Sequence, residues 1–142
     1  MPILNYTTTV PTDRTMGQVQ GLLVRAGAWQ VLTNYEAGKP TSIAFTLNTP
    51  SGPRSFVLPV DTEAVHFLLD HDRKVERRFK TKEQAERVAW RIIKDWLEAQ
   101  LAILESGMVS FDQIMLPYMR SGNGQTMYEL YLADQLALGT GT

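Results

Sequence analysis

Two segments of the chain repeat apolar residues every three or four positions, the spacing of a helix that buries one face. The first follows Thr15 and Gln18, which have the spacing of a capping box, and it ends at Gly27. The second follows Thr81 and continues from residue 82 to residue 106 without Gly or Pro. The pattern therefore predicts a short N-terminal helix and one long helix in the second half of the chain.

Between these helices the apolar period changes from about three and a half residues to two. Alternation is found at 28–35, 42–48 and 56–60, and turn sequences that contain Gly or Pro separate the three runs. This arrangement predicts a three-stranded antiparallel meander. Trp29 and Tyr35 fall on the same face of the first strand, and we expect both side chains in the core.

The complete pattern predicts an α+β fold with an N-terminal helix, a three-stranded antiparallel meander, a long helix packed on the sheet and a short helical C-terminal arm. A short helix over 61–69, capped by Asp61 or by the next residue, precedes the long one. We expect a single domain over 1–142, with an α-β-β-β-α core at 15–106 and the arm at 107–138. The apolar positions of the long helix cover roughly 220° of its circumference, so we expect a second packing partner, either the arm or a second subunit.

Composition excludes several classes of protein. With 142 residues, 44% hydrophobic and 20% charged, the chain has enough apolar surface for one globular core. It has no apolar run of the ~18 residues that a membrane span needs and no signal-peptide pattern, so a cytoplasmic protein is expected. The absence of cysteine removes disulfides, thiolate nucleophiles and cysteine zinc sites. The sequence motifs of serine hydrolases, zinc proteases and P-loop enzymes are absent as well, so we assign no catalytic residue and no cofactor.

Two weaker patterns bear on metal and anion binding. Glu63 and His66 have the spacing of half a carboxylate-bridged metal site, and Asp70 follows them, but no second pair completes the site. A structural or solvated role is favoured over an enzyme, and no metal is assigned. The segment 121–126 precedes a helical pattern and could offer backbone N–H groups to an anion, but it lacks the lysine of a phosphate loop and is interpreted as a turn.

Charge is distributed unevenly along the chain. The net charge is −1, yet the segment 73–94 holds nine of the fourteen basic residues and only three acidic ones, which gives it a net charge of +6. The nine are Arg73, Lys74, Arg77, Arg78, Lys80, Lys82, Arg87, Arg91 and Lys94. The last three recur at helical spacing and are expected on an exposed helix face. A stripe of this kind is typical of a phosphate-binding surface, and the alternative is a solvated or protein-docking face.

Phe79 is an apolar residue inside this basic segment. Its ring could stack on a base or anchor the segment to the core, and anchoring is favoured because an apolar side chain among charges commonly marks a contact with the domain.

The element order helix, meander, long helix over residues 15–104 resembles that of double-stranded RNA-binding domains. The meander and long helix are also similar to the cores of small single-strand DNA-binding and annealing proteins. An insertion of about 20 residues before the long helix departs from the RNA-binding pattern, in which a lysine cluster begins the second helix. Lys80, Lys82 and Arg87 match that cluster only loosely, so its RNA contacts are not carried over.

A second resemblance covers most of the chain and is to small uncharacterised proteins encoded by bacteriophages and prophages. The segments that carry it are 15–27, Phe56-Val57-Leu58-Pro59, 84–96, Leu116-Pro117-Tyr118-Met119 and Gly124-Gln125-Thr126. This resemblance implies a phage origin and a place in the bacterial cytoplasm, and it implies no particular activity.

These observations lead to one hypothesis and one alternative. The hypothesis is a non-enzymatic phage accessory protein that binds nucleic acid, with single-stranded DNA favoured, during replication or recombination. The alternative is a protein-docking or inhibitor module in which the basic stripe meets an acidic host protein and the arm completes a homodimer.

Overall fold

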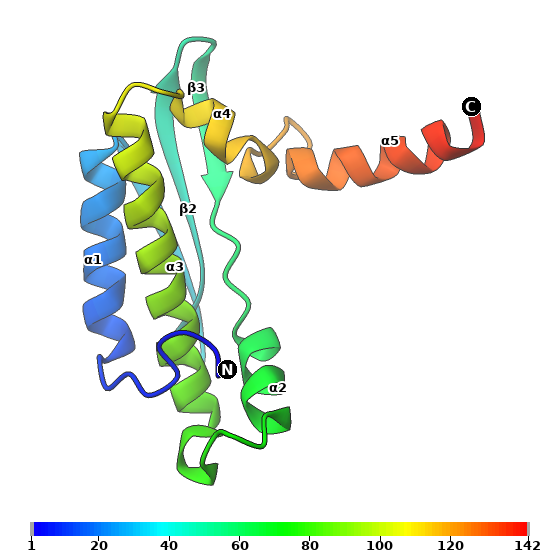
Figure 1. Cartoon of the computed structure of the whole chain (residues 1–142). Helices are drawn as coiled ribbons and strands as arrows, with labels where there is room; N and C mark the ends of the chain where they lie inside the picture. The colour runs from blue at the N-terminus through cyan, green and yellow to red at the C-terminus, as the bar shows by residue number, and fades with distance from the viewer. Residues whose placement is uncertain (1, 142) are drawn as a thin grey trace. The chain divides into compact units, whose positions relative to one another are not determined.

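The computed structural model describes residues 2–141, with side chains described as far as residue 134 (Figure 1). The helices are α1 (Thr12–Arg25), α2 (Thr62–His71), α3 (Lys82–Glu105), α4 (Phe111–Met115) and α5 (Met127–Gly141), with 3₁₀ turns η1 (Arg77–Phe79) and η2 (Leu116–Tyr118). The strands are β1 (Gln30–Glu36), β2 (Lys39–Thr49) and β3 (Gly52–Val57). This order of elements confirms the predicted α+β class, the antiparallel meander and the helical C-terminal arm.

The chain divides into two compact units. Residues 1–25 and 59–102 form the first, which contains α1, α2 and most of α3. Residues 26–58 and 103–142 form the second, which contains the sheet and the arm. None of the helices in the part of the chain that the structure describes is both long and apolar enough to cross a membrane.

Helix α1 begins three residues before the predicted capping pair, so the assignment of Thr15 as a cap is wrong. The Pro11 carbonyl accepts from the backbone N–H groups of Arg14 and Thr15, and Thr15 itself is buried within the helix. Pro11 therefore stands directly before the helix, and its carbonyl accepts the first bonds of the helix. The predicted cap at Asp61 is confirmed, because its carboxylate accepts from the Ala64 N–H at 3.0 Å. Thr81 and Gln84 also have the spacing of a capping box, and the Thr81 hydroxyl accepts from the Gln84 N–H at 3.1 Å, but the Gln84 side chain bonds to other partners.

The apolar surface of α3 has a partner that the sequence pattern did not indicate. Ala85 and Val88 form a buried cluster with Leu69 of α2, and Ile3 and Tyr6 of the N-terminal segment pack against it. Sequence reasoning proposed the C-terminal arm or a second subunit for this role. The N-terminal residues and α2 cover this part of the helix, and the arm and the second subunit stay predictions for the rest of it.

The sheet of the second unit has the order β1-β2-β3. Its apolar face buries Phe45 of β2 and Phe56 of β3 with centroids 5.4 Å apart, and Phe111 of α4 meets both rings edge-on at 5.8 and 5.2 Å. The prediction that Trp29 and Tyr35 lie in the core is wrong, because their exposed fractions are 60% and 58%. Both are at the outer strand of the sheet, where alternation does not by itself place a side chain under other elements.

Candidate functional site

The basic segment between α2 and α3 is a structured loop held by two apolar residues. Val75 is buried in the cluster that Leu69 of α2 forms with α3, and Phe79 packs against that cluster. The Phe79 ring is edge-on to Tyr6, with 5.7 Å between the ring centroids. The guanidinium carbon of Arg78 lies 4.6 Å from the centre of the Phe79 ring, which is within the range of a cation–π contact. Phe79 therefore anchors the loop and supports the side chain next to it.

The basic side chains of this loop are directed to solvent. Arg73, Lys74, Arg77, Arg78 and Lys82 are exposed, and Lys80 is half-buried with its Nζ donating to the Asp70 carbonyl at 3.2 Å. Arg78 also pairs with Glu76 at 2.9 Å, but both side chains are about two-thirds exposed, and such surface pairs are weak. Residues 73–82 carry six basic groups and one acidic group, so this loop presents a net charge of +5.

Gln84 is the central polar contact of the site. Its side chain is 4% exposed, and its Nε2 donates to the carbonyls of Tyr6 at 2.8 Å and Thr8 at 3.0 Å. Its Oε1 accepts from the Nε of Arg87 at 2.9 Å. The buried amide therefore joins the N-terminal segment to the first turn of α3 and fixes the plane of one arginine.

These residues surround a pocket of about 380 Å³. Thr8, Thr9, Arg78, Phe79, Gln84 and Arg87 line it. Two guanidinium groups at one pocket beside the N-terminus of a 24-residue helix create a positive potential, which favours an anionic group. Sequence reasoning included both arginines and the phenylalanine but missed Gln84, Thr8 and Thr9, whose part depends on contacts between residues 76 or more positions apart.

The helical part of the predicted stripe differs from the loop. Arg87, Arg91 and Lys94 were expected on an exposed face, but all three are half-buried. Arg91 donates to the Gln18 amide oxygen at 2.5 Å, and Lys94, with a side chain only 14% exposed, lies 3.1 Å from Glu98 and 3.8 Å from Asp95. The expectation of an exposed face is therefore wrong, because α1 and neighbouring carboxylates of α3 occupy the side chains of Arg91 and Lys94.

The histidines have structural contacts. The His66 Nε2 lies 3.0 Å from the Lys80 carbonyl, next to the cap of α3, and His71 stacks on Phe67 with centroids 4.0 Å apart. Glu63 and Asp70 are exposed. Among the described residues, no three His, Asp or Glu side chains come together in a way that could hold a metal ion.

The glycine-containing segment 121–126 forms a tight turn whose backbone is occupied. The Ser121 N–H donates to the Gln125 carbonyl at 2.7 Å, and the Gly124 N–H donates to the Ser121 carbonyl at 3.1 Å. At the start of α5, the Glu129 carboxylate accepts from the Thr126 N–H at 3.0 Å while the Thr126 hydroxyl accepts from the Glu129 N–H at 3.2 Å. The backbone bonds confirm the predicted turn. The capping box places the Glu129 carboxylate at the helix N-terminus, where an anion would otherwise bind.

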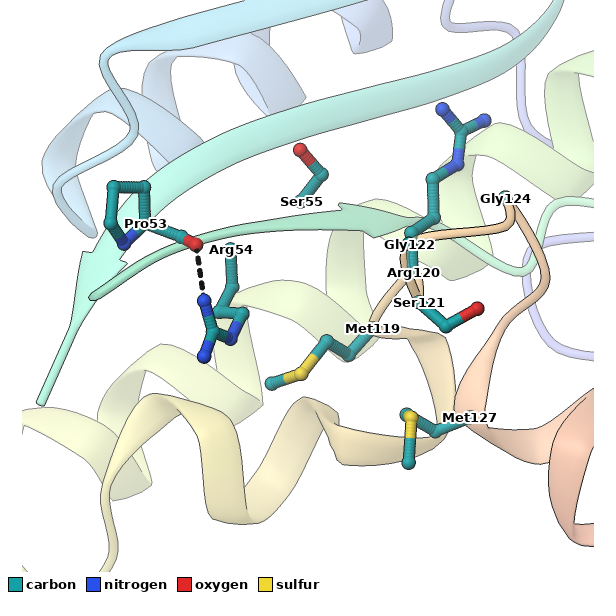
Figure 2. A pocket seen from close by; sticks show the side chains of 9 residues that line it. All are labelled: Pro53, Arg54, Ser55, Met119, Arg120, Ser121, Gly122, Gly124 and Met127. Carbon is teal, nitrogen blue, oxygen red and sulfur yellow. Dashed lines mark hydrogen bonds between the residues drawn. The ribbon is translucent and has the colours of Figure 1, made fainter. Parts of the chain in front are cut away.

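A larger pocket of about 540 Å³ lies beside this turn, and Arg54 and Arg120 line it. Figure 2 shows that these two side chains point away from each other, with Arg54 turned back to the Pro53 carbonyl at 2.8 Å. Because the two arginines do not converge, this pocket is a weaker candidate for an anion than the one beside Gln84.

Comparison with known proteins finds no matching family model, no matching curated protein and no matching solved structure. The function is therefore argued from the geometry of the site.

Proposed function

We propose that the protein binds nucleic acid, with single-stranded DNA favoured, through the basic loop 73–82 and the arginine pocket beside Gln84. The observation that carries this proposal is the fixed position of Arg87. A buried amide with three hydrogen bonds holds its guanidinium at a pocket that Arg78 also lines. Pre-oriented guanidinium groups bind phosphate oxygens at a smaller entropic cost than free side chains.

The charge of the loop supports a polyanion as the ligand. Five exposed basic side chains over ten residues match the repeated charges of a phosphate backbone, since each neutralised phosphate releases counterions. The loop has no acidic residue other than Glu76. The site therefore suits a flexible chain of phosphates better than one isolated anion.

The contact between Arg78 and Phe79 supports the single strand over the duplex. The Arg78 guanidinium lies over the Phe79 ring, and an arginine plane offers a surface on which a base can stack. Only unpaired nucleotides present the face of a base to such a surface. The resemblance to phage proteins implies a place in the cytoplasm of a bacterial host, and we propose a non-enzymatic accessory role in replication or recombination there.

The experiment is a fluorescence-anisotropy titration of labelled oligo-dT, and of a duplex of equal length, across a range of salt concentrations. Five phosphate contacts predict that the logarithm of the association constant falls with the logarithm of salt with a slope of about −3.5 for the single strand. We expect tighter binding to oligo-dT than to the duplex. No binding to either at low salt would overturn the proposal and would favour docking to an acidic host protein.

A charge-reversal pair locates the interface. Arg77→Glu with Arg78→Glu should weaken binding to oligo-dT by roughly 100-fold, because two phosphate contacts become repulsive. Arg14→Glu with Arg120→Glu is the matched control, since both are exposed arginines outside the loop and the net charge changes equally. An equal loss in the control would show that total charge, and not this loop, determines binding.

A further inference from the structure

Strand β1 is the open edge of the sheet. It pairs with β2 on one side, and among the described residues no strand pairs with the other side. The opposite edge is covered by the chain itself, because Phe56 of β3 bridges to Met119 and the Arg120 N–H donates to the Ser55 carbonyl at 2.8 Å. One edge is therefore closed from within the protein and the other is left available.

The open edge carries three exposed apolar side chains. Trp29, Leu32 and Tyr35 have exposed fractions of 60%, 55% and 58%. The segment 29–36 contains no lysine, arginine or proline, the residues that commonly block pairing at exposed edges. An edge with these properties is either a site of aggregation or an interface.

The edge strand is also regular along its length. The sheet has one register shift, where Asn34 pairs with Ser42 and Tyr35 with Pro40. The extra residue, Thr41, therefore lies on β2, and β1 continues without interruption. Two such strands can pair along their whole length.

We propose that β1 binds β1 of a second copy of this chain in antiparallel orientation, with the two Leu32 residues facing each other on the twofold axis. In this register each Trp29 lies opposite a Tyr35 of the other copy, and each Gln30 lies opposite an Asn34. Residues opposite each other in an antiparallel pair share a face of the sheet, so all three exposed apolar side chains gain an apolar partner. The two three-stranded sheets become one sheet of six strands.

The neighbouring register is less favourable. A shift of two residues, the smallest that keeps facing side chains on one face of the sheet, sets Trp29 opposite Ala37, which has a φ of +51° in the turn between β1 and β2 and cannot continue the ladder. The proposed register also avoids facing two like charges, because Glu36 lies opposite Ala28. With the backbone included, the interface buries on the order of 1,000 Å², the low end for a specific complex, so we expect a dimer that dissociates in the micromolar range.

Single-cysteine cross-linking tests the register, since the chain has no natural cysteine. Leu32→Cys should form a disulfide-linked dimer under mild oxidation, because facing residues have Cα atoms about 4.5–5.5 Å apart, within the range of a disulfide. Asn34→Cys is the control. Its counterpart in the second copy lies about 13 Å further along the strand, so it should not cross-link.

Sedimentation velocity over roughly 1–200 μM protein tests the dimer itself. We expect the natural sequence to associate, Leu32→Lys to remain a monomer, and Phe67→Lys, a change at an equally exposed side chain of α2, to associate as before. Trp29→Lys and Tyr35→Glu should each weaken the dimer, and their combination should restore it by forming two Lys–Glu pairs. Circular dichroism confirms that each variant is folded.

Three results would overturn the proposal. The first is a monomer at every concentration, and the second is a dimer that Leu32→Lys leaves intact. The third is cross-linking by Asn34→Cys that equals that of Leu32→Cys, which would indicate random collision or another register.

Discussion

The two parts of the basic stripe have similar composition and opposite surroundings. In the loop, five of six basic side chains are exposed. Glu76, the carboxylate that pairs with Arg78 there, is exposed as well. In the helix, Arg87, Arg91 and Lys94 are half-buried, and each bonds to a named partner from the protein. The difference shows that a run of charge along a sequence combines groups available to a ligand with groups that hold the fold.

Arg87 belongs to both parts. It is bonded like the other helical residues, yet its partner is a buried amide and it lines a pocket with a loop arginine. Its position suggests that the fold orients this side chain toward the ligand site. Substitutions at Gln84, Lys94 and Thr81 separate the structural contribution of the stripe from its contribution to binding, in order of decreasing effect.

The largest effect is expected at Gln84. Gln84→Leu leaves the carbonyls of Tyr6 and Thr8 without their donor in a buried site, so the free energy of unfolding should fall by about 3 kcal/mol. Binding of oligo-dT by the folded variant should weaken by roughly tenfold, because Arg87 loses the bond that orients it. Urea denaturation and anisotropy titration measure the two effects.

Gln18→Leu is the matched control for this experiment. It removes an amide that also accepts from an arginine, Arg91, but on an exposed surface. The free energy of unfolding should change by less than about 0.5 kcal/mol and binding should be unchanged. Equal effects of the two glutamine variants would contradict the distinction between a buried hub and a surface contact.

The fold was predictable where local pattern decides the structure. The long helix was recognised from an uninterrupted segment after Thr81, and the meander from its period of two between turn sequences. In both cases the information is contained within a few residues of each position. The first turn of α1 was missed because Thr15 matches a cap in sequence while the proline at position 11 sets the true start.

The site was predictable only in its composition. The loop arginines and lysines follow from a count of charge, but the link from Gln84 to the N-terminal segment has no local signal, since those two partners lie 78 and 76 positions away. Helical spacing correctly placed Arg87 and Arg91 near one another along α3, yet it could not show that Gln18 of α1 lies beside Arg91. Which side of a helix faces solvent depends on tertiary packing that periodicity does not contain.

A smaller effect is expected at Lys94. Lys94→Glu places a carboxylate in a largely buried position beside Asp95 and Glu98, so the free energy of unfolding should fall by about 2 kcal/mol. Lys74→Glu makes the same charge change at an exposed loop position and should leave stability within about 0.5 kcal/mol while weakening oligo-dT binding. If both variants lost binding with unchanged stability, the helical part would be a ligand surface after all.

The smallest effect is expected at Thr81, where the loop meets the helix. Its hydroxyl accepts from the Gln84 N–H at 3.1 Å, so Thr81→Ala should lower the free energy of unfolding by about 1 kcal/mol, and Thr81→Ser should retain most of it. Binding should change little, because Gln84 keeps both carbonyl partners and continues to hold Arg87. A loss of binding as large as that of Gln84→Leu would mean that the helix cap, and not the buried amide, orients the arginine.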